Sequence, residues 1–338
     1  MKTHVPRVVA DVDTGIDDAL ALSYLALLHR QGRIDLRVTT SAGNCTADNA
    51  AANSADVLAA MGVDIPVTAG APAPLQVPLT TTPVTHGPTG LGYHTTQASA
   101  SDYPTDVAAA VATWEGADYI LVAGPATNLA WAMENAPQVL TGARICLMSG
   151  AFIYPGNTTP TAEWNAWVDP HALKSVLAGL GKVGAEPPVF CPLNVTEQVL
   201  LSPERLDAWN LPDKLGTTLL NEAMRFYFEF HQQVGVGYTA QIHDLAAAMV
   251  LLDTVDYTAV SATVDVEAES ELMRGTTVAD YANAAAQGDG REDGCEVGVG
   301  PYWGHKANAR IVKELLPDDV FAEFERALNQ ENRKERLS

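Results

Sequence analysis

Four aspartates stand close together near the start of the chain: Asp11, Asp13, Asp17 and Asp18. The apolar run that begins at Val8 predicts a buried strand leading into this segment, and a helix is expected to follow it. Carboxylates this close repel one another unless a cation neutralises them, and ligation by oxygen alone favours Ca²⁺ or Mg²⁺ over zinc or copper. The segment therefore predicts a cation site at the carboxyl end of a strand, where open α/β sheets bind their ligands.

A simpler interpretation of the four aspartates is a helix whose first turn carries acidic residues, since the macrodipole favours negative charge there. It accounts for the last two aspartates but not for the two that precede the turn. An EF-hand loop counted from Asp11 would need glycine where Ile16 stands and an acid where Leu22 stands. A phosphatase that begins with strand-D-x-D would need threonine or valine where Gly15 stands, and a dinucleotide fingerprint would need more than one glycine in this turn.

The elements that would position these residues alternate between strand and helix, which predicts a mostly parallel sheet with helices on both faces. The expected strands are Val8–Val12, Leu36–Thr40, Ile65–Val67, Tyr119–Val122, Arg144–Met148, Val189–Cys191 and Ala262–Glu269. The expected helices are Asp17–Arg30, Ala47–Met61, Thr105–Trp114, Ala126–Glu134, Pro170–Leu180 and Leu315–Leu328. We predict one large, Rossmann-like α/β domain over residues 1–338. It would contain a mainly helical excursion at about 202–252, broken at Gly235–Gly237, and a turn region at Gln287–Gly294.

The composition restricts the classes of partner. The 338 residues are 47% hydrophobic, which excludes a disordered chain, and the net charge of −21 disfavours nucleic acid and anionic membrane surfaces. No apolar stretch approaches the roughly 20 residues that a membrane span needs, and no signal-type segment opens the chain. Four separated cysteines are expected to be reduced packing residues of a cytoplasmic protein: Cys45, Cys146, Cys191 and Cys295.

Further polar residues follow the other predicted strands, so they are expected at the same edge of the sheet. These residues are Asn44, the turn Ala123-Gly124-Pro125-Ala126-Thr127-Asn128, and the group Asn157, Glu163, Trp164 and Asn165. Two histidines stand out by their context: His86 precedes a glycine in a long loop, and His243 precedes Asp244 at a helix start. Each residue alone is ordinary in a turn or a cap, but their joint placement favours a functional site.

The ordered set resembles the inosine–uridine nucleoside hydrolase family. The segment Asp11–Ala19 is similar to the family signature D-x-D-P-G-x-D-D-A, with Thr14 in place of the proline. The other motifs that follow in the family's order are Gly43-Asn44, His86-Gly87, Gly124–Asn128, Glu163-Trp164-Asn165, His243-Asp244 and Arg274–Val278. The resemblance covers nearly the whole chain. It implies the nucleoside hydrolase fold, a bound Ca²⁺ and hydrolysis of the N-glycosidic bond of ribonucleosides in purine and pyrimidine salvage.

The resemblance also implies roles for single residues. Asp13 would be a calcium ligand and the base that deprotonates a calcium-bound water, which attacks an oxocarbenium-like ribose. The other implied ligands are Asp18, Asp244 and the carbonyl of Ala123, where many relatives carry threonine. Asp17, Asn157, Glu163 and Asn165 would hold the ribose hydroxyls, Asn44 would orient the water, and Asp11 would support the ligands. His243 would be the leaving-group acid, His86 would lie near the base, and Trp164 would either stack on the substrate or pack.

Several alternatives stay open on the sequence. The leaving group could be nicotinamide or a modified base instead of an ordinary nucleobase. The chain could also be a calcium-stabilised nucleoside-binding protein without turnover. Phosphatase activity is the least favoured of these alternatives. The expected partners are a small ribonucleoside and a second copy of the chain, because members of the family form homodimers or homotetramers.

Overall fold

The computed structural model describes residues 4–209, 211, 219–282, 303 and 305–335. The strands are β1 (Arg7–Val12), β2 (Asp35–Thr40), β3 (Val67–Ala69), β4 (Tyr119–Val122), β5 (Arg144–Leu147), β6 (Val189–Phe190), β7 (Leu200–Leu201), β8 (Ala240–Gln241), β9 (Tyr257–Val266), β10 (Thr277–Asp280) and β11 (Ala309–Leu315). The helices are α1 (Ile16–Arg30), α2 (Ala47–Ala60), α3 (Pro83–His86), α4 (Val107–Ala112), α5 (Thr127–Asn135), α6 (Trp164–Val168), α7 (Pro170–Gly179), α8 (Leu193–Thr196), α9 (Pro203–Ala208), α10 (Asn221–Gln233), α11 (Asp244–Leu251) and α13 (Pro317–Glu335).

The described strands form one nine-stranded sheet in the order β10-β9-β11-β6-β5-β4-β1-β2-β3, and β7 pairs with β8 apart from it. Strands from β3 to β11 pair in parallel, whereas β9 is antiparallel to both of its neighbours. The predicted single α/β domain with a mostly parallel sheet is therefore confirmed.

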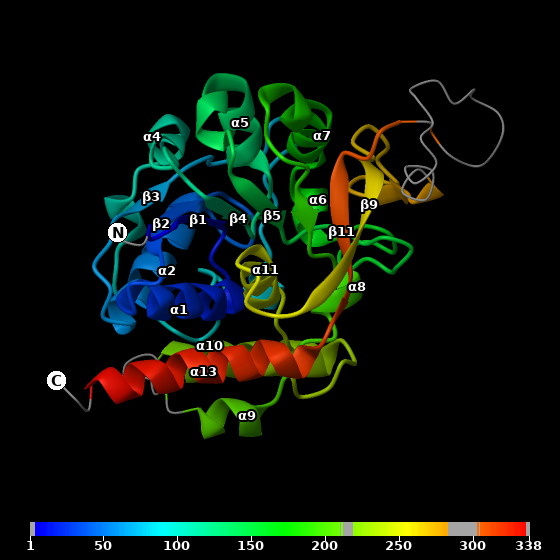
Figure 1. The fold of residues 1–338 in the computed structure, drawn as a ribbon. Helices are drawn as coiled ribbons and strands as arrows, with labels where there is room; N and C mark the ends of the chain where they lie inside the picture. Colours follow the sequence, from blue (N-terminus) through cyan, green and yellow to red (C-terminus); the bar gives the residue numbers. More distant parts are fainter. Residues whose placement is uncertain (1–3, 210, 212–218, 283–302, 304, 336–338) are drawn as a thin grey trace.

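Helices cover both faces of this sheet (Figure 1), with α4, α5 and α7 on one side and α1, α11 and α13 on the other. Side chains of a strand point alternately to the two faces. In β4, Leu121 belongs to the core under α1, while Ile120 and Val122 belong to the core under α5. Because both faces are covered, the central strands β1, β4 and β5 are mostly apolar, as is typical of parallel sheets.

Helix α1 is the central helix of its layer. Its residues from Ile16 to Leu28 are all buried, because α2, α11 and α13 pack around it. The Tyr24 hydroxyl donates to Oε1 of the buried Glu323 on α13 at 2.7 Å, which ties the C-terminal helix to α1. Helix α1, whose first turn carries Asp17 and Asp18, is therefore held in the core by these three helices.

Several predicted boundaries are shifted. The third strand is Val67–Ala69 instead of Ile65–Val67, because it pairs in register with β2. The strand expected at Ala262–Glu269 begins at Tyr257, and the C-terminal helix begins at Pro317 because residues up to Leu315 pair with β9. The 202–252 excursion is mostly helical but contains the short strand β8, and α10 ends at Gln233 before the predicted glycine break. Gln287–Gly294 lies outside the described residues.

The predictions for the cysteines and for membrane-spanning segments can also be compared with the structure. Cys45, Cys146 and Cys191 are buried with free thiols, and Cys295 lies outside the described part. Among the helices of the described residues, none is both long and apolar enough to cross a membrane.

The register brings the ends of β2, β1 and β4 to one edge, since Asp11 pairs with Thr39 on one side and with Val122 on the other. Asn128 of α5 joins these ends. Its Nδ2 donates to Oδ1 of Asp11 at 2.8 Å and to the carbonyl of Thr40 at 3.0 Å, and its Oδ1 accepts from the amide of Ala71 at 2.9 Å.

We expect Asn128→Ala to lower the free energy of unfolding by about 2–4 kcal/mol, because it leaves buried hydrogen-bonding groups without partners. Asn135→Ala is the matched control, since Asn135 is an exposed residue at the other end of α5; it should stay within about 0.5 kcal/mol of the parent. Urea unfolding followed by circular dichroism measures both. Equal stability of the two variants would show that Asn128 does not hold this edge.

Candidate active site

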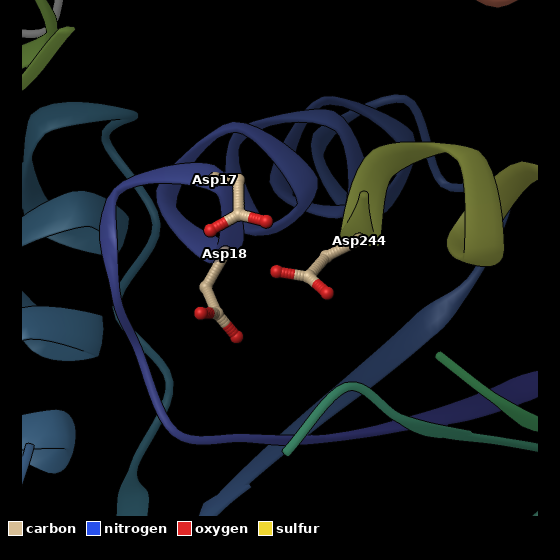
Figure 2. A group of neighbouring side chains, drawn as sticks. All are labelled: Asp17, Asp18 and Asp244. Carbon is tan, nitrogen blue, oxygen red and sulfur yellow. The ribbon is translucent and has the colours of Figure 1, made fainter. Parts of the chain in front are cut away.

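Three carboxylates from two helices converge at the carboxyl edge of the sheet. Asp17 and Asp18 lie in the first turn of α1, and Asp244 is the first residue of α11. Each offers an oxygen within 4.8 Å of the others, and all three side chains are buried. Figure 2 shows them pointing into one space between the two helices. We call Asp17, Asp18 and Asp244 the acidic triad.

Asp13 lies beside the acidic triad, in the turn between β1 and α1. The backbone N–H of Asn44 donates to its Oδ2 at 2.7 Å, and Nδ2 of Asn44 donates to its Oδ1 at 3.0 Å. The same Nδ2 lies 3.2 Å from Oδ2 of Asp18, and the Gly15 amide donates to that oxygen at 2.8 Å. Asn44 therefore bridges Asp13 to the triad.

Asp11 lies within β1, two residues before Asp13. Its Oδ1 accepts from the Thr39 hydroxyl and from Asn128, both at 2.8 Å. It is fully buried and not a cavity-lining residue. Its position fits a supporting role for the turn that carries Asp13.

The electrostatics of the cluster are unfavourable without a cation. Burial, followed by the charge of Asp18, raises the pKa of Asp17 to about 7, and burial raises the pKa of Asp18 to about 6. Burial and the neighbouring aspartates raise the pKa of Asp13 and of Asp244 well above the ordinary range. Oxygens of Asp17 and Asp244 lie within 4.8 Å of each other and of Asp18, so without a cation the cluster is favoured when it keeps a shared proton that neutralises part of this charge.

These residues fit a divalent metal ion. The donor set consists of oxygens, and Oδ1 of the buried Asp18 has no hydrogen-bond partner among the described residues. A cation would take the place of the shared proton and give that oxygen a partner. The acidic triad is thus a group that could hold a metal, and it includes Asp17, which the resemblance assigns to ribose.

The ribose candidates other than Asp17 lie on a second wall, formed by α6 and the loop before it. Glu163 caps α6 and accepts from the amides of Asn165, Ala166 and Gly150 at 2.7, 3.0 and 3.0 Å. Nδ2 of Asn165 donates to the carbonyl of Ala123 at 2.6 Å, while its buried Oδ1 has no partner among the described residues.

The more exposed members of this wall are Asn157 and Trp164. Oδ1 of Asn157 accepts from the Trp164 amide at 3.0 Å. The Trp164 ring stacks on Trp167 with centroids 5.7 Å apart, so packing accounts for one of its faces.

A cavity of about 570 Å³ joins these walls, and Asp17, Asp244, Asn44 and Ala123 contribute to its lining. A further part of the lining is formed by α10 and the turn after it, through Tyr227, Phe230, Val234 and Val236. No sequence signal marked these residues, because apolar residues at helical spacing are typical of any packed helix.

Three histidines line the cavity, His86, His231 and His243, and the sequence motifs marked the first and the last of them. Nδ1 of His86 accepts from the Ile16 amide at 3.0 Å, and Nδ1 of His243 lies 2.8 Å from the Thr196 hydroxyl. Burial lowers the pKa of each ring to about 3, so both are neutral near pH 7. The residues named from the sequence thus either line the cavity or lie directly behind it, as Asp11, Asp13 and Asp18 do.

Comparison with known proteins identifies the family. The sequence profile of the inosine-uridine preferring nucleoside hydrolases matches residues 8–322, from β1 into α13. The chain belongs to this family. It is therefore an enzyme of the nucleoside hydrolase type, as the resemblance of its motifs indicates.

Individual relatives agree with this assignment. The chain is 32% identical to the non-specific ribonucleoside hydrolase RihC of Salmonella paratyphi A over 286 residues, which are 83% of this chain and 90% of that protein. The structure of a plant nucleoside hydrolase, PpNRh1, matches with a TM-score of 0.77 and 26% identity over 96% of this chain and 99% of that one. A purine-preferring ribonucleoside hydrolase from Gardnerella vaginalis shares the fold, with a TM-score of 0.75 at 22% identity over 95% and 98% of the two chains.

Gly43 lets the loop after β2 approach the acidic residues. A Cβ at this position would lie 2.1 Å from Oδ2 of Asp13 and 2.7 Å from Cδ of Pro125. We expect Gly43→Ala to lower kcat/KM for nucleoside hydrolysis at least about 100-fold by displacing Asp13. Gly181→Ala is the control, because a Cβ there meets open space. Near-parental activity of Gly43→Ala in a reducing-sugar assay would contradict this reading.

The raised pKa values of the triad predict a pH-dependent effect of metal. Without metal, the folded state keeps protons on Asp17 and Asp18 that the unfolded chain has released, so stability falls as pH rises from about 4 through 7. A bound cation removes this loss. We therefore expect calcium to raise the melting temperature over EDTA-treated enzyme by about 5 °C or more at pH 7.5, and by clearly less at pH 5.5. Equal increments at both pH values in differential scanning fluorimetry would contradict it.

Proposed function

We propose that this enzyme hydrolyses the N-glycosidic bond of ribonucleosides in a calcium-dependent reaction that releases ribose and the free base. The observation that carries the proposal is a cavity lined by Asp17 and Asp244 of the acidic triad together with Glu163 and Asn165. A sugar with vicinal hydroxyls needs hydrogen-bond acceptors on both sides, and this cavity supplies them. The name of RihC, a ribonucleoside hydrolase, supports the substrate class.

Calcium would be held by Asp13, Asp18, Asp244 and the carbonyl of Ala123. Calcium accepts six to eight oxygen ligands in flexible geometry, which suits a set of carboxylates and one carbonyl. When bound, it would lower the pKa of a coordinated water and orient the sugar. The Ala123 carbonyl keeps a second lone pair beside its bond from Asn165, so both interactions are compatible.

The chain's own residues would carry the remaining steps. Asp13 would accept the proton of the attacking water, with Asn44 fixing both carboxylate oxygens in place. Asp17, Asn157, Glu163 and Asn165 would hold the ribose hydroxyls, and their negative charge or dipoles would stabilise the oxocarbenium-like ribose as the base departs.

The departing base would lie between the two histidines and the aromatic side chains of α10. A ring N–H aimed at the base can stabilise the negative charge that develops on it. The role of His243 as leaving-group acid stays a prediction of the family resemblance, as do the homodimeric or homotetrameric state and the cytoplasmic location.

Release of reducing sugar tests the reaction class. We would assay inosine, uridine, cytidine and nicotinamide riboside with calcium and after exhaustive chelation. Calcium-dependent release from at least one substrate is the expected result, and magnesium or zinc should restore less activity than calcium. Calcium bound without any release would favour the non-enzymatic binder.

Asp13→Asn separates catalysis from binding. The amide cannot take a proton from water, so we expect kcat to fall by about 10²–10⁴-fold while KM changes little. Asp102→Asn on the exposed surface is the control and should behave like the parent. A near-normal kcat for Asp13→Asn would show that another group is the base.

A further inference from the structure

The motif at residues 274–278 has no role in the proposed reaction, and none of its residues lines the cavity. It leads into β10, which pairs with β9 at the edge of the nine-stranded sheet. From this position it contacts the second wall of the cavity at three places: both ends of the loop between β5 and α6, and the last turn of α6. The same wall carries Asn157, Glu163 and Asn165, which we propose to hold ribose hydroxyls.

Arg274 holds the C-terminal end of α6. Its Nε donates to the carbonyl of Trp167 at 2.8 Å, and its Nη2 donates to the carbonyl of Val168 at 3.1 Å. These carbonyls belong to the last turn of the helix, where the helix itself supplies no N–H donor. The guanidinium carbon also lies 4.0 Å from the ring centroid of Trp167, in a cation–π contact. Arg274 thus caps α6 with two hydrogen bonds and a ring contact.

Gly275 lets the chain pass directly beside α6. It has a φ of +77°, and a Cβ at this position would lie 2.4 Å from Cα of Trp167. Thr276 then forms an antiparallel bridge with Ala162, and its Oγ1 lies 2.6 Å from Oγ1 of Thr161. Both ends of α6 are therefore in contact with the same short segment.

Thr277 fixes the other end of the loop, next to β5. Its Oγ1 accepts from the amide of Ala151 at 2.9 Å and donates to the carbonyl of the same residue at 3.1 Å. The preceding residue, Gly150, donates its amide to Oε2 of Glu163 at 3.0 Å. The position of the Glu163 carboxylate therefore depends on a loop that Thr277 holds.

Helix α6 needs such support because it consists of only five residues, Trp164–Val168. A helix this short gains little stability from its own hydrogen bonds. Glu163 is its N-cap, and Asn165 lies in its first turn with a buried Oδ1 that has no partner among the described residues. A rotation of α6 would displace both side chains together.

We propose that Arg274 and Gly275 are positioning residues that fix the orientation of α6 and thereby determine how strongly the second wall selects for a ribose hydroxyl. Neither residue lines the cavity, so both act through the end of α6 that carries Trp167. This inference rests on the proposed function, since it concerns the sugar that the same site binds.

The test compares sugars that differ by one hydroxyl. We would use the best substrate among the four nucleosides of the assay above, together with its 2′-, 3′- and 5′-deoxy analogues, and measure kcat/KM from release of the free base by calcium-loaded enzyme. The preference for a hydroxyl is the ratio of two kcat/KM values of one protein. It does not depend on the fraction of that protein that is folded, so a merely structural role would leave it unchanged.

The variants are Arg274→Lys and Gly275→Ala, with Asn165→Ala to identify the hydroxyl that the second wall binds. Lysine keeps the charge but cannot donate to both carbonyls through a planar fork. Arg205→Lys is the matched control, because Arg205 also lies over a ring, that of Phe321 at 4.6 Å, and is not a cavity-lining residue.

We expect the parent to prefer the ribonucleoside to at least one deoxy analogue by more than about tenfold, since a site built to bind a hydroxyl rejects the analogue that lacks it. Asn165→Ala should lower that preference. Arg274→Lys and Gly275→Ala should lower the same preference at least about threefold, because a small displacement of binding groups is costly. Their preferences for the other hydroxyls should stay within about twofold of the parent, as should all preferences of Arg205→Lys.

Equal loss of kcat/KM on all substrates in Arg274→Lys and Gly275→Ala, or parental preferences in both, would show that the segment supports only the fold and would overturn the proposal. A change in one of the two variants alone overturns the role of the other residue. A parent without any preference, or one whose preferences Asn165→Ala leaves intact, shows that α6 does not select a hydroxyl, which also overturns the proposal. Absence of turnover of all four nucleosides by the parent overturns the proposed function itself.

Discussion

The repulsion among buried carboxylates is the constraint on which this structure depends. Asp13 and the acidic triad are removed from water and lie close to one another, so burial and mutual charge both disfavour their ionised forms. Among the described residues, no Lys or Arg side chain lines the cavity to neutralise them. The cluster is stable either with shared protons or with a cation, and this choice links metal binding, pH and folding in one equilibrium.

The sheet explains how such a cluster can be built. Parallel pairing brings the ends of β1, β2 and β4 to one edge, and the first turn of α1 places Asp17 and Asp18 where the helix dipole offsets part of the negative charge. The apolar packing around α1 holds this turn rigidly. Asp244 lies far along the chain, on α11. It reaches Asp17 and Asp18 because α11 packs directly against α1.

The part of the cavity formed by α10 and the turn after it differs in its chemistry. It combines aromatic and aliphatic side chains with polar groups that include Glu197, Gln241 and the rings of His86 and His243, both neutral near pH 7. Each ring is oriented by one hydrogen bond to a residue that belongs to the scaffold, Ile16 for His86 and Thr196 for His243.

The sequence by itself determined the alternation of strands and helices, the clustering of carboxylates at one edge of the sheet and most of the polar residues that line the cavity. These features have local signals: a strand followed by clustered acids, and polar residues where parallel strands end. Only the tertiary structure shows that Asp17 lies in the acidic triad and that Asn44 bridges Asp13 to Asp18. It also shows that Tyr227 lines the cavity and that Thr196 contacts His243. Those relations depend on how distant helices pack, and a side chain's neighbours across a helix interface leave no pattern in the sequence around it.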